Sequence, residues 1–201
     1  MHAIETRTYK SGTISFYHDD DPPNPRTEWD NLGTMLCKHP RYILGDRARH
    51  DPEPTAEDIH TVAKKRNVLW VNLYLLDHSG LRLSCNVHDA YTPYMGWDTS
   101  RIGIAYVTLG RLRKEFGRKM SATELRKKGM EILHSEVETY DQYLSGQVYG
   151  YVARNAAGDE VGSCWGFFGW DYLKTEALEQ AQAELDAAET DTQEALASCP
   201  I

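Results

Sequence analysis

The chain has 201 residues, of which 41% are hydrophobic and 26% charged, and its formal net charge is −8. This balance supports a folded core the size of one ordinary domain and excludes a disordered chain. No run approaches the roughly 18 apolar residues of a membrane span, and residues 1–7 lack the apolar core of a secretory signal, so we expect a cytoplasmic protein without a membrane partner.

The first half of the chain predicts strands and one capped helix. A short strand is expected over residues 12–18, followed by an acidic, proline-rich loop over 19–25. Residues 27–38 read as a short helix or an irregular loop. Thr55 and Asp58 have the spacing of a capping box, which predicts a helix from there to Arg66.

The middle of the chain predicts a hairpin and two helices. Residues 68–76 are apolar on both faces and read as a central strand, and after a turn at 78–80 the alternation over 81–88 predicts its partner. Another strand is expected over 102–107 and a helix over 108–118. Ser121 and Glu124 form a second capping box, which opens a long helix running to about Ser145.

A second hairpin, 147–154 with 160–168, and a helix over 171–189 complete the pattern. Two hairpins favour an α+β fold, in which an antiparallel sheet built from the hairpins and single strands carries packed helices. We expect one domain over residues 1–170, with residues 171–201 as an acidic helix and tail packed on it. Cys37, Cys85 and Cys164 lie among apolar or aromatic neighbours, which is typical of buried reduced thiols.

Several stretches resemble a family of small proteins from phages and other mobile elements. They are WDNLGTM (29–35), YILGD (42–46), LYLLDHSG (73–80), WDTSRIG (97–103), EVETYDQYLSG (136–146) and SCWGFFG (163–169). The chain departs from the family pattern at Asp98-Thr99-Ser100-Arg101, where the pattern has Asp-Ser-Gly-Gln, and the acidic end after residue 171 lies outside it. The resemblance implies an accessory protein of a virus or plasmid, a class often devoted to disarming host defence.

Carboxylates and histidines at turns are candidates for a divalent-metal site, since Mg²⁺, Mn²⁺ and Ca²⁺ take oxygen ligands. The candidate ligands are Asp30, Asp46, Asp77, His78 and Asp98. Acids also cluster over residues 18–30, and His134, Glu138 and Asp141 share one helix face. Such a metal could activate water for phosphoester hydrolysis. The alternatives are aspartates that cap turns and a solvated helix face, and no cofactor besides such a metal is indicated.

Charge is segmented along the chain. Residues 101–128 hold nine basic and two acidic residues, whereas residues 171–201 hold one basic and eight acidic residues. The basic run could bind nucleic acid through Arg111, Arg113, Lys114, Arg118 and Lys119. It could equally be a solvated face, or pair with the acidic helix.

The acidic helix could instead present a row of negative charge to a basic groove on a nucleic-acid enzyme. We expect this row and nearby aromatic residues to bind a partner, through Glu176, Glu179, Glu184, Asp186, Glu189, Trp170 and Phe168. An ordinary solvated helix and a packed aromatic core would give the same composition.

The hypothesis that follows is a non-enzymatic accessory protein that binds and inhibits a host defence protein, in the manner of an anti-CRISPR or anti-restriction protein. The alternatives are a divalent-metal-dependent hydrolase acting on a phosphoester or nucleotide, and a nucleic-acid-binding accessory protein. The sequence leaves open a homodimer and the identity of the host target. No nucleophile elbow, P-loop or dinucleotide-binding glycine motif is present.

Overall fold

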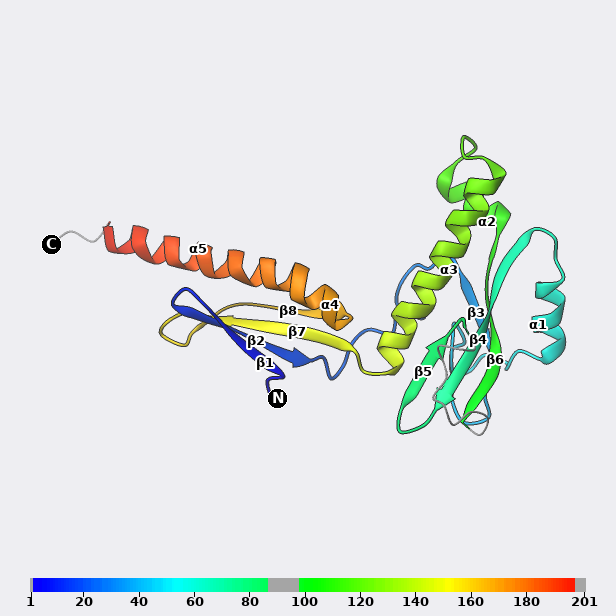
Figure 1. Ribbon diagram of the computed structural model, residues 1–201, viewed down its shortest axis with the longest axis horizontal. Helices are drawn as coiled ribbons and strands as arrows, with labels where there is room; N and C mark the ends of the chain where they lie inside the picture. The colour runs from blue at the N-terminus through cyan, green and yellow to red at the C-terminus, as the bar shows by residue number, and fades with distance from the viewer. Residues whose placement is uncertain (1, 87–97, 198–201) are drawn as a thin grey trace. The chain divides into compact units, whose positions relative to one another are not determined.

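The computed structural model describes residues 2–86 and 98–197 (Figure 1). The chain forms two compact units: unit 1 contains Met1–Pro23 and Gly146–Ile201, and unit 2 contains Asn24–Ser145. Each unit holds one four-stranded antiparallel sheet, which confirms the α+β class. The two predicted hairpins therefore belong to separate sheets, and the division differs from the expected single domain over residues 1–170.

Unit 1 is a meander of strands with helical segments after the last strand. Its strands follow the order β1-β2-β7-β8 and pair antiparallel throughout. The elements are β1 (Glu5–Tyr9), β2 (Gly12–His18), β7 (Val148–Arg154), β8 (Glu160–Phe168), α4 (Trp170–Tyr172), the π-helical turn η1 (Leu173–Ala177) and α5 (Leu178–Ala197).

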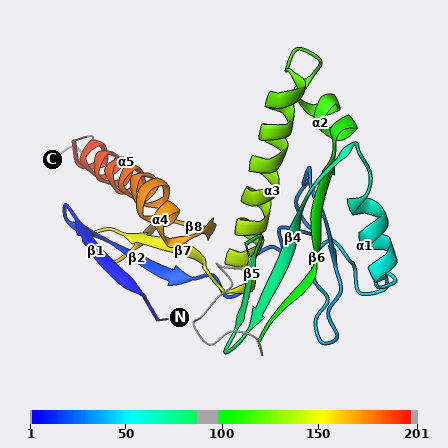
Figure 2. The same cartoon turned by 45° about the vertical axis from the view of Figure 1, so that its right-hand side comes forward.

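The core of unit 1 lies between this sheet and the helical segment that follows it. Alternate residues of β2 and β7, including Phe16 and Tyr151, point to the helical side because side chains alternate across a strand. Leu173, Ala181 and Leu185 form the matching apolar seam of η1 and α5. Figure 2 shows α5 running along one side of this sheet.

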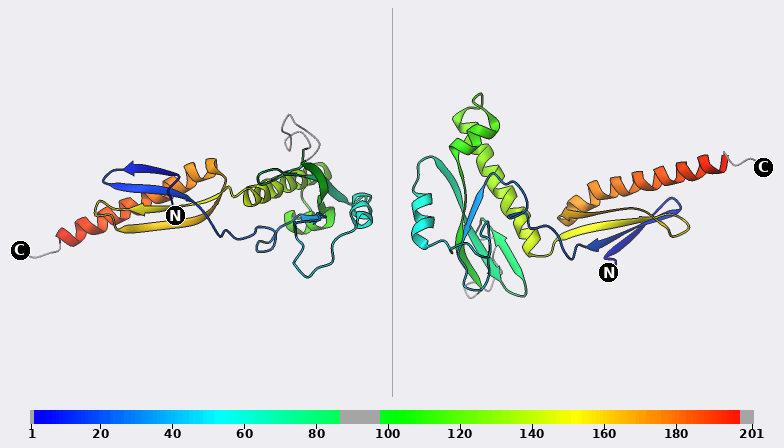
Figure 3. Two further views of the ribbon diagram at one scale, coloured as in Figure 1. Left: turned by 90° about the horizontal axis from the view of Figure 1, so that it is seen from below. Right: turned by 180° about the vertical axis from the view of Figure 1, so that it is seen from behind.

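Unit 2 has strand order β3-β6-β4-β5 and three helices. Its elements are β3 (Thr34–Cys37), α1 (Ala56–Ala63), β4 (Val68–Asp77), β5 (Leu81–Ser84), β6 (Thr99–Thr108), α2 (Leu109–Phe116) and α3 (Ala122–Leu144). Figure 3 shows α3 and α1 on opposite sides of this sheet. Leu125, Leu133 and Val137 of α3 pack on Leu73 and its neighbours in β4.

Both predicted capping boxes are present, and they fix where α1 and α3 begin. Thr55 accepts a hydrogen bond from the Asp58 amide at 3.1 Å, and the Asp58 carboxylate accepts one from the Thr55 amide at 2.8 Å. Ser121 and Glu124 repeat the pattern at 3.2 and 2.9 Å. Each box satisfies two backbone N–H groups that the first helical turn leaves without partners.

Three elements differ from the sequence-based expectations. Residues 34–37 form a strand, β3, where a short helix or loop was expected, and β1 was not predicted. β3 can pair because Gly103 of β6 has no side chain: a Cβ there would strike the Leu36 carbonyl oxygen. The last helix extends through residues 190–192 to Ala197. The predicted strand over 81–88 is described only to residue 86, and Cys199 also lies outside the described residues.

Candidate functional site

The five residues predicted to bind a metal lie at three separate places in unit 2. Asp30 is fully exposed, and its carboxylate lies 3.8 Å from the Arg111 guanidinium. Asp46 accepts a hydrogen bond from the guanidinium of Arg26 at 2.7 Å and one from the Met35 amide at 3.2 Å. Burial raises the pKa of the Asp46 carboxyl above its usual range, although Arg26 opposes the shift.

The third place holds the other three candidates, where β4 ends and β6 begins. The Asp98 carboxylate lies 2.8 Å from Nδ1 of His78, and its carbonyl accepts from the Asp77 amide at 2.8 Å. The Asp77 carboxylate instead binds the Arg41 guanidinium and the Tyr42 hydroxyl. Within the described residues no three or more His, Cys, Asp or Glu side chains gather as a metal site, so the predicted five-residue set does not assemble.

The acidic cluster over residues 18–30 is likewise dispersed. The His18 ring stacks on Tyr149 and its Nδ1 lies 3.2 Å from the Gly146 carbonyl oxygen, so this side chain is part of unit 1. Glu28, in unit 2, accepts from the Asn24 amide at 2.7 Å. The Glu28 contact is a turn interaction, which is the alternative to metal binding, whereas His18 packs against an aromatic ring.

A buried ion-pair network around Arg26 was missed by the sequence analysis. The Arg26 side chain is 1% exposed and donates to Asp46, to Glu136 at 2.8 Å and to the Gly33 carbonyl at 2.9 Å. Glu136 also accepts from the amides of Leu32 and Gly33 at 2.9 and 3.0 Å. The network joins three of the stretches that carry the family resemblance, 29–35, 42–46 and 136–146, and it gives a structural role to Asp46 and Glu136.

On α3, Asp141 is buried and its partners come from β5. It binds the Arg82 guanidinium through both oxygens, at 2.9–3.1 Å, and accepts from the Leu83 amide at 2.6 Å. His134, Glu138 and Asp141 line one hollow of about 440 Å³ beside β5. The shared helix face is therefore correct, but Asp141 anchors a strand and leaves no carboxylate oxygen free for a metal.

The basic run is partly used within unit 2. Arg111 donates to the Asn31 carbonyl at 2.7 Å and Arg113 donates to the Met120 carbonyl. Lys114, Arg118 and Lys119, at the end of α2 and in the following turn, are exposed, and no ion pair involves them in the part of the chain that the structure describes. Of the five predicted nucleic-acid contacts, three thus remain exposed cations without an ion pair among the described residues.

The acidic residues of the last helix divide into two sets. Glu184 accepts from the Tyr151 hydroxyl at 3.0 Å, Asp186 pairs with Lys10 at 2.6 Å, and Glu189 accepts from the Ser11 hydroxyl at 2.9 Å. The bond from Lys10 lowers the pKa of Asp186, and Asp186 in turn raises the pKa of Lys10. These inner acids hold the helix on the sheet, while Glu176 and Glu179 are exposed.

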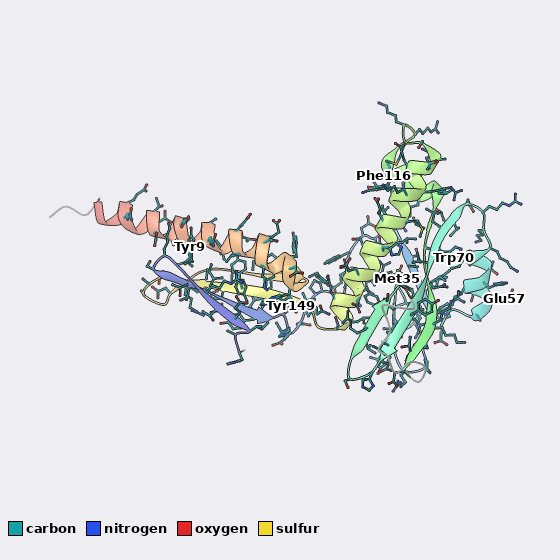
Figure 4. The ribbon with its side chains drawn as sticks, in the orientation of Figure 1. Tyr9, Met35, Glu57, Trp70, Phe116 and Tyr149 are labelled. Carbon is teal, nitrogen blue, oxygen red and sulfur yellow. The ribbon has the colours of Figure 1, made fainter. Side chains whose placement is uncertain are left out.

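The aromatic residues also divide between the two faces of the unit 1 sheet. Trp170 packs edge-on against Phe16 and Tyr149, at ring distances of 6.1 and 5.1 Å, so it belongs to the core side. Tyr149, labelled in Figure 4, belongs to the same buried cluster as Phe16 and Leu173. Trp165, which pairs with Gly150, lies on the opposite face beside Tyr17 and is 37% exposed. Phe168 is half-buried.

Three cysteines lie within the described residues. Burial raises the pKa of the Cys37 thiol to about 12, and Cys85 and Cys164 are half-buried. Among the described residues no helix combines the length and the apolar character needed to cross a bilayer.

No family model, no curated protein and no solved structure matches the chain.

Proposed function

We propose that the chain is a non-enzymatic accessory protein that binds a host defence protein and blocks it, with the outer side of η1 and α5, called the α5 surface, as the contact surface. The observation that carries this proposal is that the acids of these two helical segments divide into an inner set bound to the sheet and an outer exposed set. Glu176, Glu179, Asp191 and Glu194 are exposed, and among the described residues none of them has an ion pair or a side-chain hydrogen bond.

The helix that carries this outer row is firmly anchored. Its apolar seam is buried against the sheet and its inner acids bind Lys10, Ser11 and Tyr151. Glu176 and Glu194 are 18 residues apart in the sequence, which places them about 27 Å apart along a helix. Because the helical backbone that carries these charges is already ordered, a partner needs to order only their side chains, and this favours association with a basic groove.

The net negative charge of the chain is concentrated in unit 1, which also carries this acidic row. Unit 1 holds 4 basic and 14 acidic residues, a formal charge of −10, whereas unit 2 holds 18 basic and 16 acidic residues, a formal charge of +2. Such a field speeds encounter with a positively charged protein and makes the rate dependent on salt. The partner class comes from the resemblance to phage and mobile-element proteins, which implies a nucleic-acid-cleaving defence enzyme.

The test is a cleavage assay with a panel of purified CRISPR effectors and restriction endonucleases. We expect the protein to inhibit at least one enzyme. The triple variant Glu176→Gln, Glu179→Gln and Glu194→Gln should raise the half-inhibitory concentration about tenfold or more, because it removes charges that face the partner.

The matched control removes three charges elsewhere in unit 1, by Asp19→Asn, Asp20→Asn and Asp21→Asn. This control changes the net charge equally and should inhibit as the wild type does. An equal loss of inhibition in both triple variants would mean that inhibition depends on the net charge of the protein and not on the α5 surface. The proposal fails if no enzyme of the panel is inhibited, or if the α5 variant inhibits fully.

A second candidate function, nucleic-acid binding, rests on the three exposed cations at the end of α2. The start of α3 adds Arg126, Lys127 and Lys128 to this basic corner, although Lys127 and Lys128 lie 3.8–4.0 Å from Glu131. A gel-shift titration with duplex and single-stranded DNA should show binding that weakens steeply with salt, and Lys114→Glu with Arg118→Glu should abolish it. Binding insensitive to salt, or unaffected by the two substitutions, would contradict this candidate.

A further inference from the structure

The helix α1 lies over the sheet of unit 2 without closing against it. The capping box at Thr55 and Asp58 fixes the start of the helix, and Ile59 and Ala63 face the sheet. Even so, no residue of α1 is buried, and a hollow of about 770 Å³ lies between the helix and strands β4 and β6. Small-molecule sites in proteins have volumes of about 300–1,000 Å³, so the hollow is of a size to hold a ligand.

The floor of this hollow offers a flat aromatic surface. Trp70 of β4 lines it and is 37% exposed, and Figure 4 shows Trp70 on the side of β4 that faces α1. Arg101 of β6 lies opposite Tyr74, two rows along from Trp70 on the same face, because residues paired across strands share a face. Gly103 also lines the hollow and adds no side chain to it. The indole is thus accessible to a planar group laid on the sheet.

The rim of the hollow is positively charged. Lys38, Lys64 and Arg101 line it against a single acid, Glu57. Lys38 reaches Glu53 only at 4.0 Å, and the side chains of Arg101 and Lys64 have no ion pair or hydrogen bond within residues 2–86 and 98–197. Unpaired cations beside an exposed indole are complementary to a ligand that is both planar and anionic.

We propose that this hollow binds a nucleotide, with the base stacked on Trp70 and the phosphates held by Lys38, Lys64 and Arg101. A base provides the π face that an indole stacks on, and phosphates are preferred partners of arginine and lysine. This site lies in unit 2 and is independent of the proposed inhibitory surface on α5.

The experiment is isothermal titration calorimetry of the full chain with ATP, and with adenosine and inorganic triphosphate as its two parts. We expect ATP to bind, each part alone to bind at least about tenfold more weakly, and the affinity for ATP to fall with salt. Trp70→Ala and Arg101→Glu should each weaken ATP binding about tenfold or more.

Two matched control variants distinguish loss of this site from the loss of any exposed tryptophan or any exposed cation. Trp165→Ala removes a tryptophan of the same exposure from unit 1, and Arg154→Glu reverses an exposed cation of β7. Both should bind ATP as the wild type does. Arg101 is itself exposed, so its variant tests the site even if Trp70→Ala fails to fold.

The proposal is overturned if ATP does not bind, or if Arg101→Glu binds it as tightly as the wild type does. It is also overturned if triphosphate alone binds as tightly as ATP, since the indole would then contribute nothing. Binding of an acidic, aromatic peptide in place of ATP would identify the hollow as a protein-docking groove instead.

Discussion

At the scale of single residues, Arg26 has the largest expected effect on stability. Its side chain is nearly inaccessible and pairs with Asp46 and Glu136, so Arg26→Ala leaves two carboxylates near each other without their cation. Removing one partner from a buried ion pair costs about 3–5 kcal/mol. We expect urea denaturation to show that Arg26→Ala lowers the free energy of unfolding by that amount. The exposed control Arg126→Ala should lower it by less than about 0.5 kcal/mol. A loss below about 1 kcal/mol would show that the network contributes little.

The Lys10–Asp186 pair predicts a pH dependence for unit 1. The pKa of Asp186 is lowered from 3.8, so its stabilising effect is present above that pH and is lost as pH falls through the folded-state pKa. The pKa of Lys10 is raised from 10.5, so its effect is lost as pH rises through the folded-state pKa. In thermal melts, the melting temperature of the wild type should exceed that of Lys10→Met between these two pH limits. The two melting temperatures should converge at either pH extreme. A constant difference at all pH values would exclude the ion pair as its cause.

The same residues show what the sequence could and could not indicate about the site. Asp46 and Asp98 have the right chemistry for metal ligands, and nothing local distinguishes them from carboxylates that bind a distant arginine. The partner of Asp46 lies 20 residues away and that of Arg26 in α3 lies 110 residues away. Such pairings depend on tertiary structure, and the only local sign was a cluster of charged residues in stretches that otherwise read as turns.

At the scale of elements, one carboxylate attaches a strand to a helix. β5 is an edge strand, and Asp141 of α3 accepts from its Leu83 amide and binds its Arg82 side chain. Because Arg82 is half exposed, most of the expected loss comes from the buried amide: we predict about 2 kcal/mol for Asp141→Ala. Amide hydrogen exchange at Leu83 should accelerate, whereas Asp141→Asn, which keeps an acceptor, should preserve most of the protection. Unchanged exchange in the alanine variant would contradict the anchoring role.

Elements with a local signal were predicted well and those without one were not. The capping residues Thr55 and Ser121 and the turn at residues 155–159 act within a few positions, so the sequence alone located α1, α3 and the β7–β8 hairpin. β3 has only four residues, and it can pair as a strand because Gly103 in β6 has no side chain to block the approach of the β3 backbone. β1 begins with four consecutive polar residues, 5–8, without the apolar alternation of a strand, so its pairing with β2 is not revealed by residues 5–9.

At the scale of the whole molecule, the two units predict separate folding. Unit 2 is continuous, Asn24–Ser145, and holds its own sheet, its own apolar core and the Arg26 network. A fragment of residues 24–145 should therefore unfold cooperatively and give amide spectra that overlay those of the same residues in the full chain. A fragment with collapsed, poorly dispersed spectra would show that unit 2 needs the rest of the chain.

Unit 1 is closed by strands from both ends of the chain, because β2 pairs with β7 across a separation of about 130 residues. During synthesis the β1–β2 hairpin leaves the ribosome before unit 2, and the edge of β2 that pairs with β7 stays unpaired until β7 has emerged. The acid-bearing helix follows β8 and can dock on the sheet only after β7 and β8 have emerged. A chain that ends between Ser145 and Val148 would thus carry all of unit 2 and an aggregation-prone hairpin, and nothing of the surface proposed to reach a host enzyme.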